Sequence, residues 1–116
     1  METRHAVAAL AALAQDSRLD VFRLLVRAGA AGLPAGQVAE RLDIPAATLS
    51  FHLSQLKHAG LVHARRDGRL QIYAVNYNAM NALMGFLTEN CCAGDACSVP
   101  VCDPATTTVT RKGARR

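Results

Sequence analysis

The 116-residue sequence lacks any hydrophobic run long enough to cross a membrane. A membrane-spanning helix needs about 18–20 apolar residues in succession, whereas the apolar run at 6–14 is short and consists mostly of alanine. The same run lacks the basic leading region of a secretory signal peptide. We therefore expect a cytoplasmic protein without a membrane partner, in which residues 6–14 belong to a helix of the fold.

Cysteine is absent from the first ninety residues, and all four cysteines fall within twelve positions of the C-terminal part. They are Cys91, Cys92, Cys97 and Cys102. In a reducing compartment, clustered cysteines bind metal or carry out redox chemistry more often than they form structural disulfides. Four soft ligands at this spacing predict a thiolate site for a soft metal or metalloid.

The composition predicts one small globular domain. Hydrophobic residues make up 51% of the chain and charged residues 19%. A single core of this size is small enough that dimerisation would add stability. The formal net charge of +4 favours a polyanionic partner such as nucleic acid.

Helical periodicity dominates the first sixty residues. One apolar stripe recurs at the spacing of a helix face and predicts a first helix. This stripe consists of Val7, Leu10, Ala11 and Ala14. Ser17 followed by Asp20 resembles a capping box, which would start a second helix that ends at Gly29.

Two further helices follow, joined by a tight turn. Pro34 stands where a helix can begin, so the segment 35–42 predicts a short third helix. After the turn at 43–45, the segment 46–59 predicts a fourth helix, which Gly60 ends. The core-facing line of the fourth helix consists of Leu49, Leu53 and Leu56.

The period changes from helix to strand after residue 60. The segments 61–66 and 69–75 are rich in β-branched, aromatic and basic residues, and Asp67-Gly68 between them is typical of a two-residue hairpin turn. Asn76 then caps a fifth helix. The apolar stripe of this helix consists of Met80, Leu83, Met84 and Leu87. We expect a second copy of the protein to cover the first and last helices, because so short a chain has too little core to bury both apolar faces.

The order of these elements predicts a mainly α fold with a β-hairpin wing, the winged helix-turn-helix. We expect residues 1–92 to form this domain with its dimerisation helices, and 93–116 to be a flexible tail that carries Cys97 and Cys102. In such a fold the second helix of the pair enters the major groove of DNA, and the hairpin lies against the backbone or the minor groove. The residues expected to touch DNA are Ala47, Thr48, Ser50, Phe51, His52, Ser54 and Gln55 on the fourth helix and Arg65, Arg66 and Arg69 on the wing.

The sequence resembles the ArsR/SmtB family of bacterial metalloregulatory repressors over most of its length, from about residue 7 to residue 92. The resemblance rests on LAQDSRL at 13–19, LSFHLSQL at 49–56, AGLV at 59–62 and RDGR at 66–69, with Tyr73. It implies a homodimer, paired through the first and last helices, that binds an imperfect palindrome in operator DNA. It also implies that the dimer leaves the operator when an inducer binds.

Two inducer sites that are common in this family are missing from the sequence. Many members hold arsenic with a cysteine pair on the helix before the recognition helix, but the matching stretch at 37–42 has no cysteine. Others hold zinc with Asp, His and Glu on the last helices, but the segment 78–90 offers one Glu and no His. The sequence Glu89-Asn90-Cys91-Cys92 is similar instead to a subgroup that binds trivalent arsenic at the end of the last helix.

The chemistry of the cysteines independently favours the same inducer. Trivalent arsenic and antimony prefer three thiolates in a pyramid, so Cys91 and Cys92 can close around the ion with one cysteine from the following loop. Cys97 is the nearest third ligand, and Gly94 makes the intervening turn easy. Cys102 can replace Cys97 or add a fourth thiolate, which would suit tetrahedral zinc. Zinc is less favoured, because the ligands of structural zinc sites usually stand two to four residues apart.

Two alternatives stay open beside an arsenic sensor. The same cysteines would serve a zinc-sensing or redox-sensing repressor, since closely spaced thiols also oxidise reversibly. The protein would be a plain DNA-binding protein if the cysteines were inert. An enzyme such as a thiol-dependent arsenate reductase is not expected, because its nucleophilic cysteine needs a helix N-terminus, whereas these cysteines follow a helix C-terminus.

Overall fold

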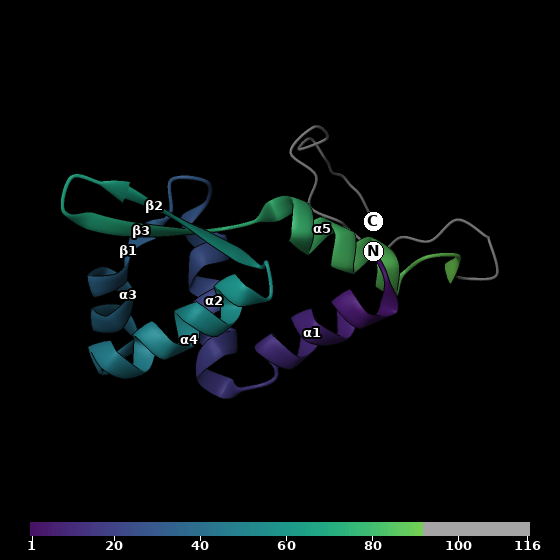
Figure 1. Cartoon of the computed structure of the whole chain (residues 1–116), viewed down its shortest axis with the longest axis horizontal. Coiled ribbons are helices and arrows are strands. Elements are labelled where there is room, and N and C mark those ends of the chain that lie inside the picture. Colours follow the sequence, from purple (N-terminus) through teal and green to yellow (C-terminus); the bar gives the residue numbers. More distant parts are fainter. Residues whose placement is uncertain (92–116) are drawn as a thin grey trace, which may run out of the picture.

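The computed structural model describes residues 1–91, which form five helices and three strands in the order α1, α2, β1, α3, α4, β2, β3, α5 (Figure 1). The helices span Thr3–Leu13, Asp16–Ala28, Ala35–Leu42, Ala46–His58 and Tyr77–Leu87, and the strands span Leu33–Pro34, Val62–Asp67 and Leu70–Val75. This arrangement confirms the predicted winged helix-turn-helix. Cys92 and the predicted tail at 93–116 lie outside the described residues. Within residues 1–91, no helix is both long enough and apolar enough to span a membrane.

Helix α1 buries a different face from the predicted stripe. Its buried residues are Ala6, Ala9 and Ala12, whereas Val7 is 58% exposed and Leu10 is 42% exposed. The small alanine side chains let α1 lie close to α2 and α4. The predicted stripe therefore lies outside the core of the single chain.

Helix α2 begins before the predicted cap. Gln15 is its N-cap, and the Oε1 atom of Gln15 accepts a hydrogen bond from the backbone N–H of Arg18 at 2.9 Å. Ser17 is already inside the helix, so the predicted capping box of Ser17 and Asp20 is wrong. The Nε atom of Arg18 also donates to the carbonyl oxygen of Ala12 at 2.6 Å. This bond ties the end of α1 to the first turn of α2.

The core lies between α2, α3, α4 and the sheet. Its largest fully buried side chains are Val21, Leu25, Val38, Leu49, Leu53, Leu56, Leu61 and Val75. The predicted apolar line of α4 is therefore confirmed. At the end of α3, Asp43 adopts the left-handed conformation with φ of 53°, and the short turn that follows directs the chain into α4.

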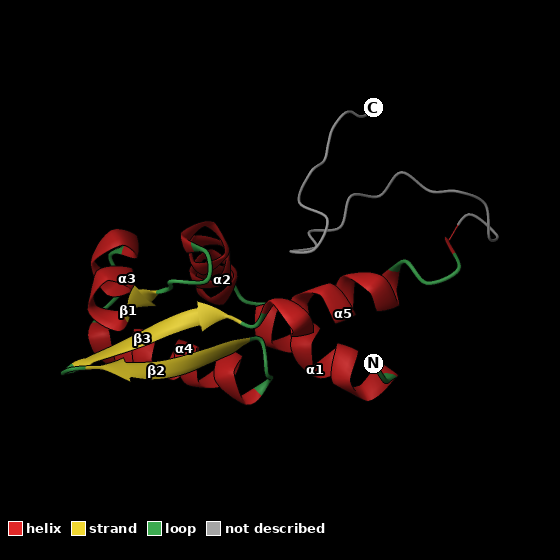
Figure 2. Ribbon diagram, turned by 90° about the horizontal axis from the view of Figure 1, so that it is seen from above, coloured by secondary structure: helices red, strands yellow, loops and turns green. Residues whose placement is uncertain are grey.

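The sheet has the strand order β1-β3-β2, and both pairings are antiparallel (Figure 2). Strand β1 consists of two residues, Leu33 and Pro34, which pair with Tyr73 and Ile72 of β3. The sequence does not predict this strand, because two residues show no alternation and proline is rare in strands. Strand β3 is thus the central strand of the sheet, with a partner on each side.

The hairpin of β2 and β3, which we call the wing, turns one residue later than predicted. Asp67 pairs with Leu70, so the two turn residues are Gly68 and Arg69. Gly68 has a φ of 65°, as the first central residue of a type II′ turn requires. Arg69 therefore lies in the turn itself, at the tip of the wing.

Helix α5 starts at a cap that the sequence predicts. The Oδ1 atom of Asn76 accepts from the N–H of Ala79 at 3.2 Å, and its Nδ2 atom donates to the carbonyl oxygen of Gly60 at 3.1 Å. The hydroxyl of Tyr77 donates to the carbonyl oxygen of Val26 at 2.9 Å, which fixes the start of α5 to α2. Helix α5 lies beside α1, at the end of the molecule opposite the wing tip (Figure 1).

Replacing Gly32 with alanine is expected to destabilise the fold by about 3 kcal/mol or more. Gly32 has a φ of +71°, and a Cβ atom at this position would overlap the carbonyl oxygen of Tyr73. A backbone oxygen cannot move aside without disturbing the pairing of β1 with β3. Gly68→Ala is the matched control, since Gly68 also has a positive φ but faces open space, and it should cost about 1 kcal/mol. Urea unfolding measures both variants, and equal losses would contradict the steric argument.

Candidate nucleic-acid interface

The N-terminal part of α4 and the tip of the wing lie at the same end of the molecule, away from α1 and α5 (Figure 1). On α4, all but one of the predicted contact residues are exposed: Ala47, Thr48, Ser50, Phe51, Ser54 and Gln55. Their hydroxyl and amide groups can reach base edges or phosphates. Helix α4 begins after Pro45, which provides no side-chain cap, so the amide groups of its first turn can also meet a phosphate.

His52 is the exception, and its place in the predicted set is corrected. Its side chain is only 7% exposed, and its Nδ1 atom has no hydrogen-bond partner among the described residues. Because it follows Leu49 by three positions and precedes Leu56 by four, His52 lies on the buried face of α4. This spacing is visible in the sequence and would have identified His52 as a core residue.

The three arginines predicted on the wing are exposed, but one of them already has a protein partner. The Nη2 atom of Arg65 donates to the carbonyl oxygen of Ala31 at 2.9 Å, which ties β2 to the loop between α2 and β1. Within residues 1–91, neither Arg66 nor Arg69 forms a salt bridge with a carboxylate. Arg66 and Arg69 thus offer their full charge to a polyanion, whereas Arg65 also positions the wing.

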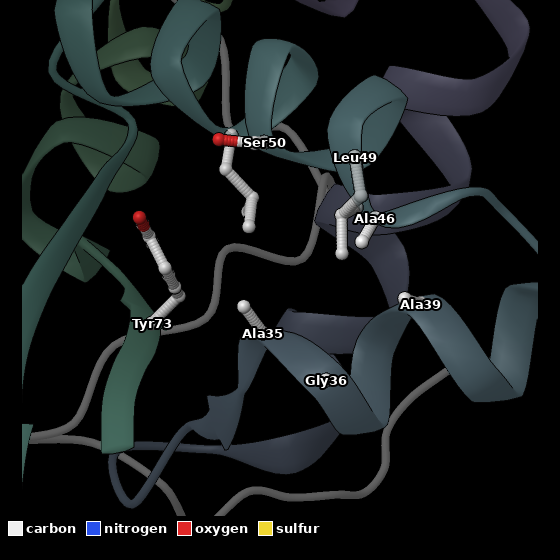
Figure 3. A pocket seen from close by; sticks show the side chains of 8 residues that line it. Ala35, Gly36, Ala39, Ala46, Leu49, Ser50 and Tyr73 are labelled. Atoms are coloured by element: carbon white, nitrogen blue, oxygen red, sulfur yellow. The ribbon is translucent and has the colours of Figure 1, made fainter. Parts of the chain in front are cut away.

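A crevice of about 90 Å³ lies between α3, α4 and β3 (Figure 3). Its walls are mostly small or apolar side chains, together with one serine and one tyrosine: Ala35, Gly36, Ala39, Ala46, Leu49, Ser50, Leu53 and Tyr73. No carboxylate lines it. In the sequence Tyr73 belongs to a motif but has no predicted role, because the approach of β3 to α4 is a tertiary contact that no local pattern predicts.

The structure describes one residue of the predicted thiolate site. Cys91 is half-buried, and its backbone N–H donates to the carbonyl oxygen of Thr88 at 3.0 Å. Helix α5 ends at Leu87, so Cys91 follows the helix. Cys92, Cys97 and Cys102 lie outside the described residues, and within residues 1–91 no group of three or more His, Cys, Asp or Glu side chains is placed to hold a metal ion.

Comparison with known proteins identifies relatives that regulate transcription. A family described as a helix-turn-helix domain matches residues 13–65. The uncharacterized HTH-type transcriptional regulator YceK of Bacillus subtilis is 35% identical over 77 residues, which cover 66% of this chain and 76% of YceK. The putative arsenical resistance operon repressor ArsR of Halobacterium salinarum is 39% identical over 67 residues, which cover 58% of this chain and 51% of that repressor.

A solved structure has a similar fold. The homodimeric winged helix-turn-helix DNA-binding domain of Mb0332 from Mycobacterium bovis, a possible ArsR-family regulator, has a TM-score of 0.61 and 27% identity. The match covers 75% of this chain and 81% of that domain. Together with the exposed face of α4 and the basic wing, these likenesses show that the chain belongs to the HTH-type transcriptional regulators and has the winged helix-turn-helix DNA-binding fold of ArsR-like regulators.

Proposed function

We propose that this regulator is an arsenic-responsive repressor, which binds operator DNA as a homodimer and leaves it when trivalent arsenic or antimony binds the C-terminal cysteines. The observation that carries the proposal is the cluster of four cysteines within twelve positions, directly after α5. The name of the Halobacterium relative refers to arsenic, whereas that of YceK refers to no ligand. The inducer is therefore proposed from the cysteines themselves.

The cysteine spacing suits a small soft ion with a lone pair. Cys91 and Cys92 supply two thiolates from adjacent positions, and Cys97 supplies the third from five residues further on. Cys102 is the alternative third ligand or a fourth one. Binding requires the thiols to lose their protons. Because the third ligand comes from further along the chain, capture of the ion would draw the segment after Cys91 toward the end of α5.

The homodimer is proposed to form through a dimer face made of α1 and α5. Its exposed apolar side chains are Val7, Leu10, Met84 and Leu87. Met84 also lines a groove between α1, α2 and α5, whose other walls are Leu13, Leu19, Phe22, Arg23, Val26 and Arg27. Exposed apolar side chains on two neighbouring helices favour burial against a second copy of the chain. The related Mb0332 domain is a homodimer.

This geometry offers a route from the ion to the DNA. Cys91 stands four positions after Leu87, the last residue of α5 and a member of the dimer face. A shift of α5 would change the spacing of the two copies of α4, which must stand about 34–36 Å apart to enter successive major grooves. A coupling free energy of about 1–3 kcal/mol would weaken DNA binding roughly 5- to 150-fold.

A reporter gene under the control of the operator tests the proposal in cells. The protein should repress the reporter, and arsenite or antimonite in the medium should restore expression. Zinc and peroxide are each added in place of arsenite. If zinc alone restores expression, the protein is a zinc sensor, and if peroxide alone restores it, the protein is a redox sensor. Repression that none of these additions relieves would contradict an inducer at the cysteines.

The number of sulfur ligands is tested separately on the purified protein. X-ray absorption at the arsenic edge should count three sulfur neighbours in the wild-type protein. If Cys97 is the third ligand, Cys97→Ser should reduce this number to two, while Cys102→Ser should leave it at three. The opposite pattern would assign the third ligand to Cys102.

A further inference from the structure

Tyr73 carries a hydroxyl group that the fold does not use. Its side chain is half-buried and forms part of the wall of the crevice between α3, α4 and β3. Among the described residues, no hydrogen bond involves the Tyr73 hydroxyl. A phenylalanine ring would fill the same apolar wall, and partly buried tyrosine hydroxyls usually have a polar partner. The hydroxyl is therefore free to bind a group from outside the chain.

Ser50 places a second hydroxyl at the same crevice. It belongs to the exposed face of α4 and lines the crevice together with Tyr73. In Figure 3 the Tyr73 ring extends from β3 toward α4, and the hydroxyl groups of Tyr73 and Ser50 lie on the same side of the crevice. The two hydroxyls come from the two elements expected to approach DNA, which are α4 and the wing.

The register of the wing places a positively charged residue on the same face of the sheet as Tyr73. Tyr73 pairs with Ala64, and Arg66 stands two residues after Ala64, so Arg66 and Tyr73 share one face of the sheet as diagonal neighbours. Arg65 lies on the opposite face and bonds to Ala31. The crevice has no carboxylate in its wall, and within residues 1–91 no carboxylate pairs with Arg66, so two hydroxyl donors near this guanidinium suit an anion.

We propose that Tyr73 and Ser50 together bind one phosphate of the DNA backbone. This phosphate then lies between α4 and the wing. Hydroxyl groups of this kind commonly bind phosphate oxygens, and the small side chains of Ala35, Gly36 and Ala46 leave the backbone room to approach. Such a contact carries no sequence information. It fixes the position of α4 along the groove relative to the wing, so Tyr73 sets the register in which α4 reads bases.

The test uses Tyr73→Phe, which keeps the ring in the crevice and removes only the hydroxyl. On a duplex that the wild-type protein selects from random DNA, binding should weaken about tenfold. Non-selected DNA should lose the same factor, because a phosphate contact is not specific for sequence. In Tyr73→Phe, the slope of log affinity against log salt concentration should not change. In Arg66→Gln this slope should fall by about one, because the arginine, unlike the tyrosine, releases a counterion when it binds a phosphate. Tyr77→Phe is the control, since its hydroxyl bonds to Val26 inside the fold and should not affect DNA affinity.

Duplexes with single neutral methylphosphonates locate the contact. When the modified phosphate is the one that Tyr73 binds in a half-site, wild type and Tyr73→Phe should have the same DNA affinity. At every other phosphate the tenfold difference in affinity should persist. Wild-type affinity in Tyr73→Phe, or a difference that no single modification removes, would overturn the proposal. The inference rests on DNA binding alone. All measurements are made without arsenic, so they can fail or succeed independently of the proposed inducer.

Discussion

Replacing either Cys91 or Cys92 with serine should leave operator affinity within about twofold of wild type and abolish release by arsenite. Both residues follow α5, whereas the residues expected to touch DNA lie on α4 and the wing, so we expect DNA binding not to require these thiols. Each substitution removes one of two adjacent thiolates, and a serine hydroxyl is too hard and too weakly acidic to replace it. Fluorescence anisotropy of labelled operator measures both effects in a phosphine reductant, because dithiol reductants compete for arsenic.

The control for this pair is the double variant in which Cys97 and Cys102 are both serine. It retains the adjacent cysteines but lacks every candidate for the third ligand, so it should need more arsenite for release than the wild type does. Full release of Cys91→Ser or of Cys92→Ser at the arsenite concentration that releases the wild type would remove the proposed site.

Replacing Leu10 with glutamate should convert the proposed homodimer into a folded monomer and weaken operator binding about 100-fold or more. Leu10 is 42% exposed in the single chain, so the charge is tolerated by the monomer, but burial of an unpaired carboxylate in the dimer costs several kcal/mol. A monomer engages one half-site at a time and loses the benefit of linked binding, which is about 10²- to 10⁴-fold. Sedimentation equilibrium measures the association, and circular dichroism checks the fold.

Leu70→Glu is the matched control for the oligomeric state. Leu70 is 52% exposed and is the first residue of β3, directly after the wing turn. The wing tip lies at the opposite end of the molecule from α1 and α5 (Figure 2). The same charge at this position should leave the dimer intact. A Leu10→Glu protein that sediments as a tightly associated dimer would show that the dimer face lies elsewhere.

The sequence predicts the helices, the wing and the exposed face of α4 because these features depend on local periodicity and turn residues. The line of Leu49, Leu53 and Leu56 is an example, since its spacing alone places it in the core. Features that depend on contacts between distant segments are not predicted. Strand β1 exists because β3 offers a free edge to Leu33, and a two-residue strand has no pattern of its own.

Two errors come from choosing between competing local signals. On α1, the pattern of the larger apolar residues favours their face as the core, but close packing against α2 and α4 favours the alanine face with Ala9 at its centre. On α2, the side chain of Gln15 caps the helix before Ser17 can do so. The candidate site shows the same division. The exposed residues of α4 follow from the helix period, whereas the meeting of Tyr73 with Ser50 follows only from tertiary structure.

Two operator isotherms for the fully reduced wild-type protein test the link between cysteines and DNA most directly. One is recorded without arsenite and the other with one equivalent for each protomer. Binding of the ion to the cysteines after α5 should shift the second isotherm to roughly 5- to 150-fold higher protein concentration. Two superimposable isotherms, from protein shown to have bound the arsenite, would contradict control of DNA binding by these cysteines.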